Sequence, residues 1–191
     1  MSGMKYHSRS STRQAGFSML ELLIAILVLV IGILGVGMLQ SVAKRGVFEA
    51  SQRTMATVLA NDIIERMRTN RAQALASRYD GNFGGGTQSA PRDCSGFAAS
   101  CNSAEVTLHD LYVWEQMLDG ADVKEGGSNI SGLTDVTGCI QQVNGTVTVV
   151  VAWHGLTKLS DAGSNKSDFA KNCGTSGEHR RMLTVETFIS L

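Results

Sequence analysis

The longest uninterrupted hydrophobic segment lies near the N-terminus of the 191-residue chain. Residues 22–39 form an 18-residue stretch without a charged or strongly polar side chain, and residues 17–40 together number 24. A helix of that length, at ~1.5 Å per residue, spans roughly 36 Å, which is enough to cross the ~30 Å hydrocarbon layer of a membrane. Core helices of soluble proteins rarely stay apolar on all faces for so long, so the pattern predicts a transmembrane helix over 17–40.

A hydrophobic stripe with helical spacing continues after the apolar segment. Its members are separated by multiples of four residues and comprise Met55, Leu59, Ile63, Met67 and Leu75, with Val58 beside them and Arg71 as an interruption. The pattern predicts one helix over 17–78, roughly 93 Å long, whose second half is amphipathic. Because such a half-helix is not stable alone, we expect its stripe to be buried against a globular head formed by 79–191.

The residues after the long helix begin with a connector and a shorter helix. Residues 81–89 (GNFGGGTQS) are rich in glycine and predict a flexible connector. Asn102 followed three residues later by Glu105 is an N-capping pattern, and it predicts a helix over 103–118. Within this helix we expect Trp114 to serve as a packing anchor.

A β-hairpin and a third strand are predicted towards the C-terminus. Asn144-Gly145 separates two β-rich runs, and this dipeptide favours a tight hairpin because both turn positions need positive φ. The predicted strands are 139–143, 146–153 and 182–189, and the predicted loops are 119–135 and 155–180. The expected fold class is therefore α+β, with a long N-terminal helix packed on a small antiparallel sheet.

Charge is balanced overall but unevenly distributed. The chain has 17 basic and 17 acidic residues, and the resulting net charge of zero argues against a generic nucleic-acid binder. Residues 1–16 carry three basic residues and no acid, so we expect the N-terminus in the cytoplasm and the bulk of the chain across the membrane. The arginines opposite the stripe are expected to be solvated or to face another subunit, and they are Arg53, Arg66, Arg68, Arg71 and Arg78.

Glu21 lies at the start of the apolar segment, where a carboxylate is unusual. An acid in the middle of a membrane helix costs ~2.5–3.5 kcal/mol on the insertion scale, and less near the helix end. No Lys or Arg occurs between Glu21 and Lys44, so the natural partner is an α-amino group, which would exist if the chain were cut just before Phe17. Chance occurrence at the membrane interface accounts for the spacing equally well.

The chain contains the run GFSMLE at residues 16–21, followed directly by the apolar segment. This arrangement resembles the class III signal of type IV pilins and pseudopilins. The resemblance implies that a membrane aspartyl peptidase cuts after Gly16 and removes the leader 1–16. It further implies that Phe17 becomes the N-methylated N-terminus and that Glu21 helps the subunit enter a growing filament.

Further segments resemble the PilV class of minor pilins within this family. They are residues 30–35 with Gln40, the helical stretch 61–72, the Asp-x-x-x-Trp element at 110–114, and the valine-rich strand 147–153. The stretch 61–72 contains the signature Glu-Arg-Met-Arg-x-Asn-Arg of that class at residues 65–71. The element at 110–114 commonly continues Leu-Pro-x-Gly, and Asp119 here takes the place of the proline.

By this resemblance the chain is expected to be a minor pilin that enters or primes a type IV pilus and serves twitching motility or adhesion. The implied partners are the prepilin peptidase/N-methyltransferase, other minor and major pilins, the inner-membrane assembly platform, and membrane lipid before assembly. The implied location is the bacterial inner membrane, with a single pass and a periplasmic head, and then the pilus. The alternatives are a type II secretion minor pseudopilin and, from another class, a signal-anchored periplasmic binding protein or enzyme.

All four cysteines follow the membrane segment, in the part of the chain that we expect in the oxidising periplasm. They allow three pairings, of which we favour Cys94–Cys101 and Cys139–Cys173. Zinc is the rival interpretation, but its sites usually contain Cys-x-x-Cys pairs, and none occurs here. The sequence also lacks the common nucleophile, zinc-protease and phosphate-loop motifs, so we expect no enzyme activity, cofactor or metal.

Overall fold

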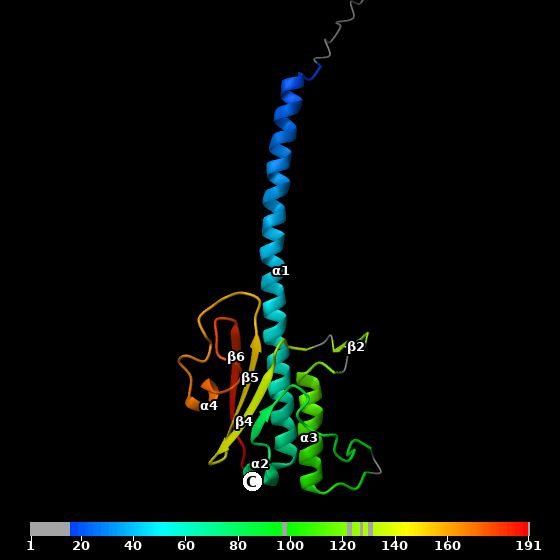
Figure 1. The fold of residues 1–191 in the computed structure, drawn as a ribbon, viewed down its shortest axis with the longest axis vertical. Coiled ribbons are helices and arrows are strands. Elements are labelled where there is room, and N and C mark those ends of the chain that lie inside the picture. The colour runs from blue at the N-terminus through cyan, green and yellow to red at the C-terminus, as the bar shows by residue number, and fades with distance from the viewer. Residues whose placement is uncertain (1–15, 97–98, 122–123, 127, 130–131, 191) are drawn as a thin grey trace, which may run out of the picture. The chain divides into compact units, whose positions relative to one another are not determined.

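The fold is that of a computed structural model, which describes residues 16–96, 99–121, 124–126, 128–129 and 132–190. The chain divides into two compact units, Met1–Lys44 and Arg45–Leu191. The first unit contains the apolar part of helix α1 (Met19–Thr69), and the second contains the rest of α1 and the other described elements, as Figure 1 labels them. The fold class is α+β, as the sequence predicts.

Helix α1 ends at Thr69, so the prediction of one continuous helix over 17–78 was wrong at its C-terminal end. Asn70 has φ −120° and ψ 51°, outside the helical region, and a short helix α2 (Arg71–Leu75) follows it. The Asn70 side-chain amide donates a hydrogen bond to the carbonyl of Ser103, 2.8 Å away. This tertiary contact holds Asn70 in its non-helical conformation, although the hydrophobic pattern of the sequence continues past residue 70.

The second half of α1 buries a face that is displaced from the predicted stripe. Leu59, Ile63 and Met67 are buried as expected, whereas Met55 and Val58 are 41% and 58% exposed. The full buried set on α1 is Gln52, Ala56, Leu59, Ala60, Ile63, Ile64 and Met67. A pattern of large apolar residues does not include Ala56 and Ala60, yet both are buried, on the side of α1 against which the rest of the unit packs.

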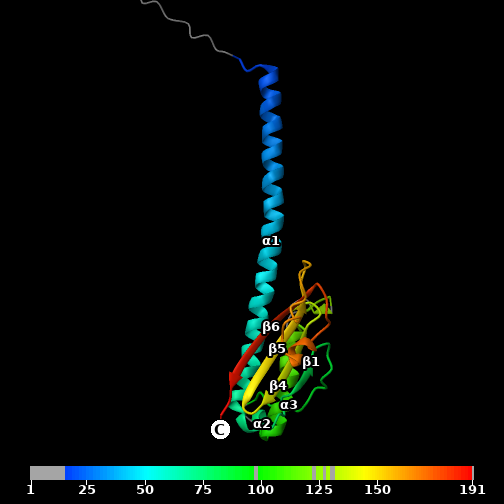
Figure 2. The ribbon, with the colours of Figure 1, turned by 90° about the vertical axis from the view of Figure 1, so that its left-hand side faces the viewer.

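The main sheet is antiparallel throughout, with the strand order β1-β4-β5-β6. Its strands are β1 (Gly81–Phe83), β4 (Thr137–Val143), β5 (Thr146–His154) and β6 (Arg180–Phe188), which Figure 2 shows from the side. The predicted hairpin and third strand are confirmed within two residues at each end. Asn144 and Gly145 have φ values of 52° and 86°, as a two-residue hairpin turn requires.

Helix α3 (Ser103–Leu118) begins and packs as predicted. The Asn102 side chain accepts the backbone N–H of Glu105 (3.0 Å), and the Glu105 carboxylate accepts that of Asn102 (2.9 Å), which completes a capping box. Trp114 is fully buried between α1 and the sheet, and its indole N–H donates to the carbonyl of Leu59 at 2.8 Å. A Cβ at Gly138 on β4 would overlap this indole, so only glycine fits there.

Three segments predicted as loops contain short regular elements. Strand β1 forms at the start of 81–89, and helix α4 (Asp168–Lys171) lies within 155–180. Within 119–135, β2 (Lys124–Glu125) pairs with β3 (Ser128–Asn129). None of these elements exceeds four residues, so none is long enough to leave a periodic hydrophobic pattern in the sequence.

The glycine-rich segment after β1 is held by two carboxylates of the α3 end, contrary to the flexible connector predicted. Five backbone N–H groups donate to them at 2.6–3.0 Å: those of Gly84, Thr87 and Gln88 to Glu115, and those of Gly85 and Gly86 to Asp119. Glu115 is fully buried. Burial raises the pKa of its carboxyl, but the hydrogen bonds from the Thr87 hydroxyl and the loop amides outweigh burial and lower that pKa overall.

Two disulfides are present in the second unit, Cys94–Cys101 and Cys139–Cys173, and they are the pairs favoured from the sequence. The first closes a local loop before α3. The second joins β4 to the segment that follows α4, and both of its cysteines are buried. It therefore fixes a long surface connection to the centre of the sheet.

Candidate functional site

The site residues predicted near the N-terminus are Gly16, Phe17 and Glu21, and they lie close together at the beginning of α1. Gly16, Phe17 and Ser18 precede the helix, and all three are exposed. The carbonyl of Ser18 accepts the N–H of Leu22 at 3.1 Å, and its hydroxyl oxygen accepts the N–H of Leu20 at 3.3 Å. Ser18 therefore caps α1, and the helix leaves the Gly16–Phe17 peptide bond outside its hydrogen-bonded turns.

The surroundings of that peptide bond are open. An added Cβ at Gly16 would meet no other atom within 4 Å, and Phe17 is 85% exposed. A protease needs an extended, accessible backbone on both sides of the bond that it cuts. Residues 16–18 are exposed and precede α1, so access to the bond from its C-terminal side needs no unfolding of the helix.

Glu21 lies in the first turn of α1, where unpaired backbone N–H groups give the helix end a partial positive charge. Its carboxylate makes no hydrogen bond or ion pair within the part of the chain that the structure describes. Residue 17 precedes it by four positions, which is about one helical turn. A positive charge at residue 17 would thus lie close to this carboxylate.

The apolar segment of α1 exposes its side chains on all sides. Of the described helices, only α1 is long and apolar enough to cross a membrane, and none of its most hydrophobic 18-residue window is buried. Large apolar residues from Leu20 to Val42 are mostly about half exposed or more. Such a surface requires an apolar environment, which lipid or other helices can supply.

Comparison with known families identifies this part of the chain. The family model of the prokaryotic N-terminal methylation motif matches residues 11–37, which contain the Gly16–Phe17 bond and Glu21. The chain therefore carries a type IV pilin-like prepilin signal, shared by pilins and pseudopilins, and this indicates a membrane-anchored structural subunit rather than an enzyme. No curated protein and no solved structure matched the chain.

The helical stretch 61–72 and the segment 110–114 meet through a buried polar cluster. Asp110 on α3 is 7% exposed, and its carboxylate accepts hydrogen bonds from Arg66 of α1 (3.2 Å) and from the hydroxyl of Tyr79 (2.7 Å). Asn70 donates to the same Tyr79 oxygen at 3.3 Å. Burial and then the Asp110 carboxylate raise the pKa of Tyr79 well above its ordinary value, so Tyr79 stays a neutral donor.

The expectation that the helix arginines are solvated or face another subunit does not hold for Arg66. Besides Asp110, Arg66 binds Asp62 one turn earlier on α1, at 2.7 Å. Arg68 is more exposed, and it bridges Glu65 and the hydroxyl of Thr187 on β6 at 2.7 and 2.9 Å. Arg66 and Arg68 therefore connect α1 to both α3 and the sheet, which is a structural role that charge patterning alone did not reveal.

The residues that sequence reasoning missed are those whose partners are distant in the chain. The sequence did not single out Glu115, and it offered Asp110 only as part of the Asp-x-x-x-Trp element, because the contacts of Asp110 form only when α1 and α3 pack together. Among the described residues, no three His, Cys, Asp or Glu side chains form a group that could hold a metal ion. The disulfides lie in the second unit and take no part in the N-terminal site.

Proposed function

We propose that this chain is a minor pilin of the PilV class, a subunit that enters or primes a type IV pilus. One observation carries the proposal: an accessible Gly16–Phe17 bond lies two residues before an exposed apolar helix with Glu21 in its first turn, inside a matched methylation motif. A prepilin peptidase hydrolyses that bond, and Phe17 becomes the N-terminus and the site of N-methylation. The products are the leader 1–16 and a mature chain that starts at Phe17.

Cleavage supplies the positive charge that Glu21 lacks. The new α-amino group lies about one turn from the Glu21 carboxylate, on the subunit itself or on a neighbour in the filament. A buried ion pair contributes little net stability but strongly disfavours arrangements that leave one charge alone. The pair therefore selects the correct axial position of the subunit, while neighbouring apolar helices replace lipid around the segment 17–40.

The basic leader and the disulfides support one orientation in the membrane. The leader carries Lys5, Arg9 and Arg13, which favour the cytoplasmic side, whereas disulfides persist in an oxidising compartment. We place the N-terminus in the cytoplasm and the head, 79–191, in the periplasm before assembly. The helical region 17–78, which contains α1 and α2, joins the membrane to the head.

The partners follow from these steps. The peptidase and N-methyltransferase act on residues 16 and 17, the inner-membrane platform extracts the subunit, and other minor and major pilins surround it in a complex that serves twitching motility or adhesion. The PilV class is supported by the polar cluster, because Arg66 binds Asp110 directly and Asn70 reaches it through the Tyr79 hydroxyl, so the two segments that resemble that class contact one another.

The test is the mass of the mature N-terminus of the protein purified from its own membranes. The proposal expects a chain that begins with N-methylphenylalanine at residue 17, and a chain that still begins at Met1 contradicts it. Gly16→Val should block cleavage, because it places a β-branched side chain at the scissile bond, where glycine has no side chain. The unprocessed chain then migrates more slowly on a gel. A matched substitution outside the signal, Gly46→Val, should be processed normally.

A type II secretion minor pseudopilin is the second candidate, since the matched motif is common to both systems. Deletion of the gene separates the two. The pilus proposal expects loss or reduction of surface fibres with normal protein export, whereas a pseudopilin deletion blocks export and leaves the fibres in place.

A further inference from the structure

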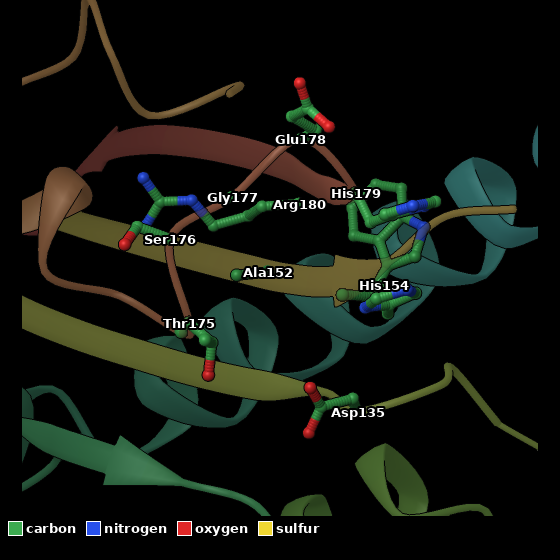
Figure 3. Close-up of a pocket in the computed structure, with 11 residues that line it drawn as sticks. Asp135, Ala152, His154, Thr175, Ser176, Gly177, Glu178, His179 and Arg180 are labelled. Atoms are coloured by element: carbon green, nitrogen blue, oxygen red, sulfur yellow. The ribbon is translucent and has the colours of Figure 1, made fainter. Parts of the chain in front are cut away.

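A cavity in the second unit is unrelated to the N-terminal signal. It has a volume of about 260 Å³ and lies between Asp135, the end of β5 and the segment 174–180 (Figure 3). Pockets for drug-sized ligands occupy roughly 300–1,000 Å³, so this one is the size of a single small ring. Figure 3 shows Asp135, Thr175 and the two histidines His154 and His179 arranged around Ala152 of β5.

The segment that forms one wall is fixed at both ends. At its start, Cys173 is bonded to Cys139 of β4. At its end, the buried Arg180 forms an ion pair with Asp161 at 2.7 Å and donates to the carbonyl of Lys171, also at 2.7 Å. Asp161 further accepts the N–H of Gly177 at 2.8 Å. Such a segment loses little conformational entropy when a ligand binds, which favours recognition.

The floor of the cavity is narrow and partly apolar. Gly174 has φ 71°, and an added Cβ would lie 2.8 Å from the Cβ of Ala152, so the segment lies directly on the strand. Trp153, which is 5% exposed, also lines the cavity. A ligand here contacts a small apolar surface as well as polar groups.

The polar side chains around the floor are open to solvent and offer hydrogen-bonding groups that no described residue uses. The side chains of Asp135, Thr175, Ser176 and His154 make no hydrogen bond with any residue that the structure describes. The Nδ1 atom of His179 lies 3.0 Å from the carbonyl of Gly155. A carbonyl only accepts, so the Nδ1–H group of His179 donates to it.

The two imidazoles are poorly arranged for a metal ion. His154 and His179 are stacked, with ring centroids 4.7 Å apart and planes inclined by 8°. A metal ion lies in the plane of each imidazole that binds it, and two nearly parallel planes do not meet at such a point. The Asp135 carboxylate instead requires O–H or N–H donors, while Thr175 and Ser176 both donate and accept.

We infer that this cavity binds a neutral polyhydroxylated ligand, namely a single sugar unit. A sugar ring presents adjacent hydroxyl groups that can donate together to the Asp135 carboxylate, and charge-assisted hydrogen bonds of this kind are the stronger ones. Its remaining hydroxyls both donate and accept, as Thr175 and Ser176 require, and its C–H face suits Ala152. The inference concerns the head alone and does not depend on processing or filament entry.

Binding is tested with the full chain purified in detergent, using D-galactose, D-mannose and N-acetyl-D-glucosamine, each coupled to serum albumin on a sensor surface. At least one sugar should bind saturably and be displaced by the same free sugar. Asp135→Asn should weaken that binding at least tenfold. Asn tolerates the φ of 49° at this position, so the backbone is retained.

Glu178→Gln is the matched control, because it also removes one negative charge at the cavity, but the Glu178 side chain points away from Ala152 in Figure 3. It should bind within twofold of the parent. Thr175→Val, which keeps the shape and removes the hydroxyl, should weaken binding. The inference is overturned by absence of saturable binding for all three sugars, by unchanged affinity of Asp135→Asn, or by an equal loss in Glu178→Gln.

Discussion

Glu21 and Glu115 are both carboxylates in costly positions, but they differ in what compensates the charge. Glu115 is satisfied within its own chain, because three backbone N–H groups and the Thr87 hydroxyl converge on it. Glu21 has no described partner, although it lies where the chain enters its most apolar segment. A carboxylate that accepts hydrogen bonds from its own chain, such as Glu115, stabilises the fold. Glu21 instead requires a positively charged partner that the described chain does not supply.

Glu21→Ala should leave cleavage at Gly16 intact and reduce incorporation into filaments at least tenfold. The peptidase acts outside the helix, whereas the ion pair that selects the subunit position needs the carboxylate. Sheared filaments and membranes would be compared by immunoblot, with Met19→Ala, which shortens an exposed apolar side chain in the same turn, as the control. Normal incorporation of Glu21→Ala would contradict the role assigned to Glu21.

Glu115 should make the stability of the head depend on pH. Because the folded pKa lies below the ordinary value of 4.5, Glu115 stabilises the fold above about pH 4.5, and this contribution is lost as the pH falls through the folded pKa. Glu115→Gln should lower the free energy of unfolding at pH 7 by about 1–3 kcal/mol, because the new amide group faces donors, and should flatten the acid dependence.

The measurement is urea unfolding of the full chain in detergent between pH 3 and pH 7, followed by the fluorescence of Trp114 and Trp153. Glu186→Gln is the control, since the Glu186 side chain is exposed on β6 and makes no hydrogen bond with a described residue. If the parent and Glu115→Gln lose stability in parallel on acidification, Glu115 is not the group responsible.

At the level of the elements, the sequence predicts those features that depend on neighbouring residues and misses those that depend on contacts between distant residues. Asn102 with Glu105, and Asn144 with Gly145, act on their own neighbours, so the start of α3 and the hairpin turn were predictable. The end of α1 was not, because Asn70 is withdrawn from the helix by hydrogen bonds to residues more than thirty positions away. The ordered glycine segment was missed for the same reason.

The two candidate sites differ in the same way, because one is formed by neighbouring residues and the other by distant segments. Gly16, Phe17 and Glu21 lie within six residues of one another, so their resemblance to a prepilin signal could be recognised in the sequence, and the family model of the methylation motif matches residues 11–37. The cavity beside His154 and His179 was unpredictable, because its walls come from β5, the segment after α4, and Asp135 in the loop before β4. Only the strand register and the Cys139–Cys173 disulfide bring these segments together.

Asp110→Ala should weaken the attachment of α1 to α3. It removes the acceptor shared by Arg66 and Tyr79, both of which remain largely enclosed, and the expected loss in unfolding free energy is about 2–3 kcal/mol. Glu65→Ala breaks an exposed ion pair with Arg68 on the same helix and should cost less than about 1 kcal/mol. Equal losses in the two variants would show that the cluster has no special role.

For the molecule as a whole, the two disulfides should differ in their importance. A chain-entropy argument gives about 4 kcal/mol for Cys139–Cys173, whose cysteines are 34 residues apart, and about 2.5 kcal/mol for Cys94–Cys101, which are 7 apart. The longer disulfide is also buried against Val150 and Ala152 at the centre of the sheet, whereas the shorter one closes a surface loop.

Replacing Cys139 and Cys173 by alanine should therefore destabilise the head more than replacing Cys94 and Cys101 does. Urea unfolding in detergent measures both losses. Because Cys173 also fixes the start of the segment 174–180, the first variant should lose sugar binding before it unfolds, whereas the second should keep it. If the short-loop variant were the less stable one, the entropic ranking would be wrong; if sugar binding survived loss of Cys139–Cys173, that disulfide would not organise the cavity.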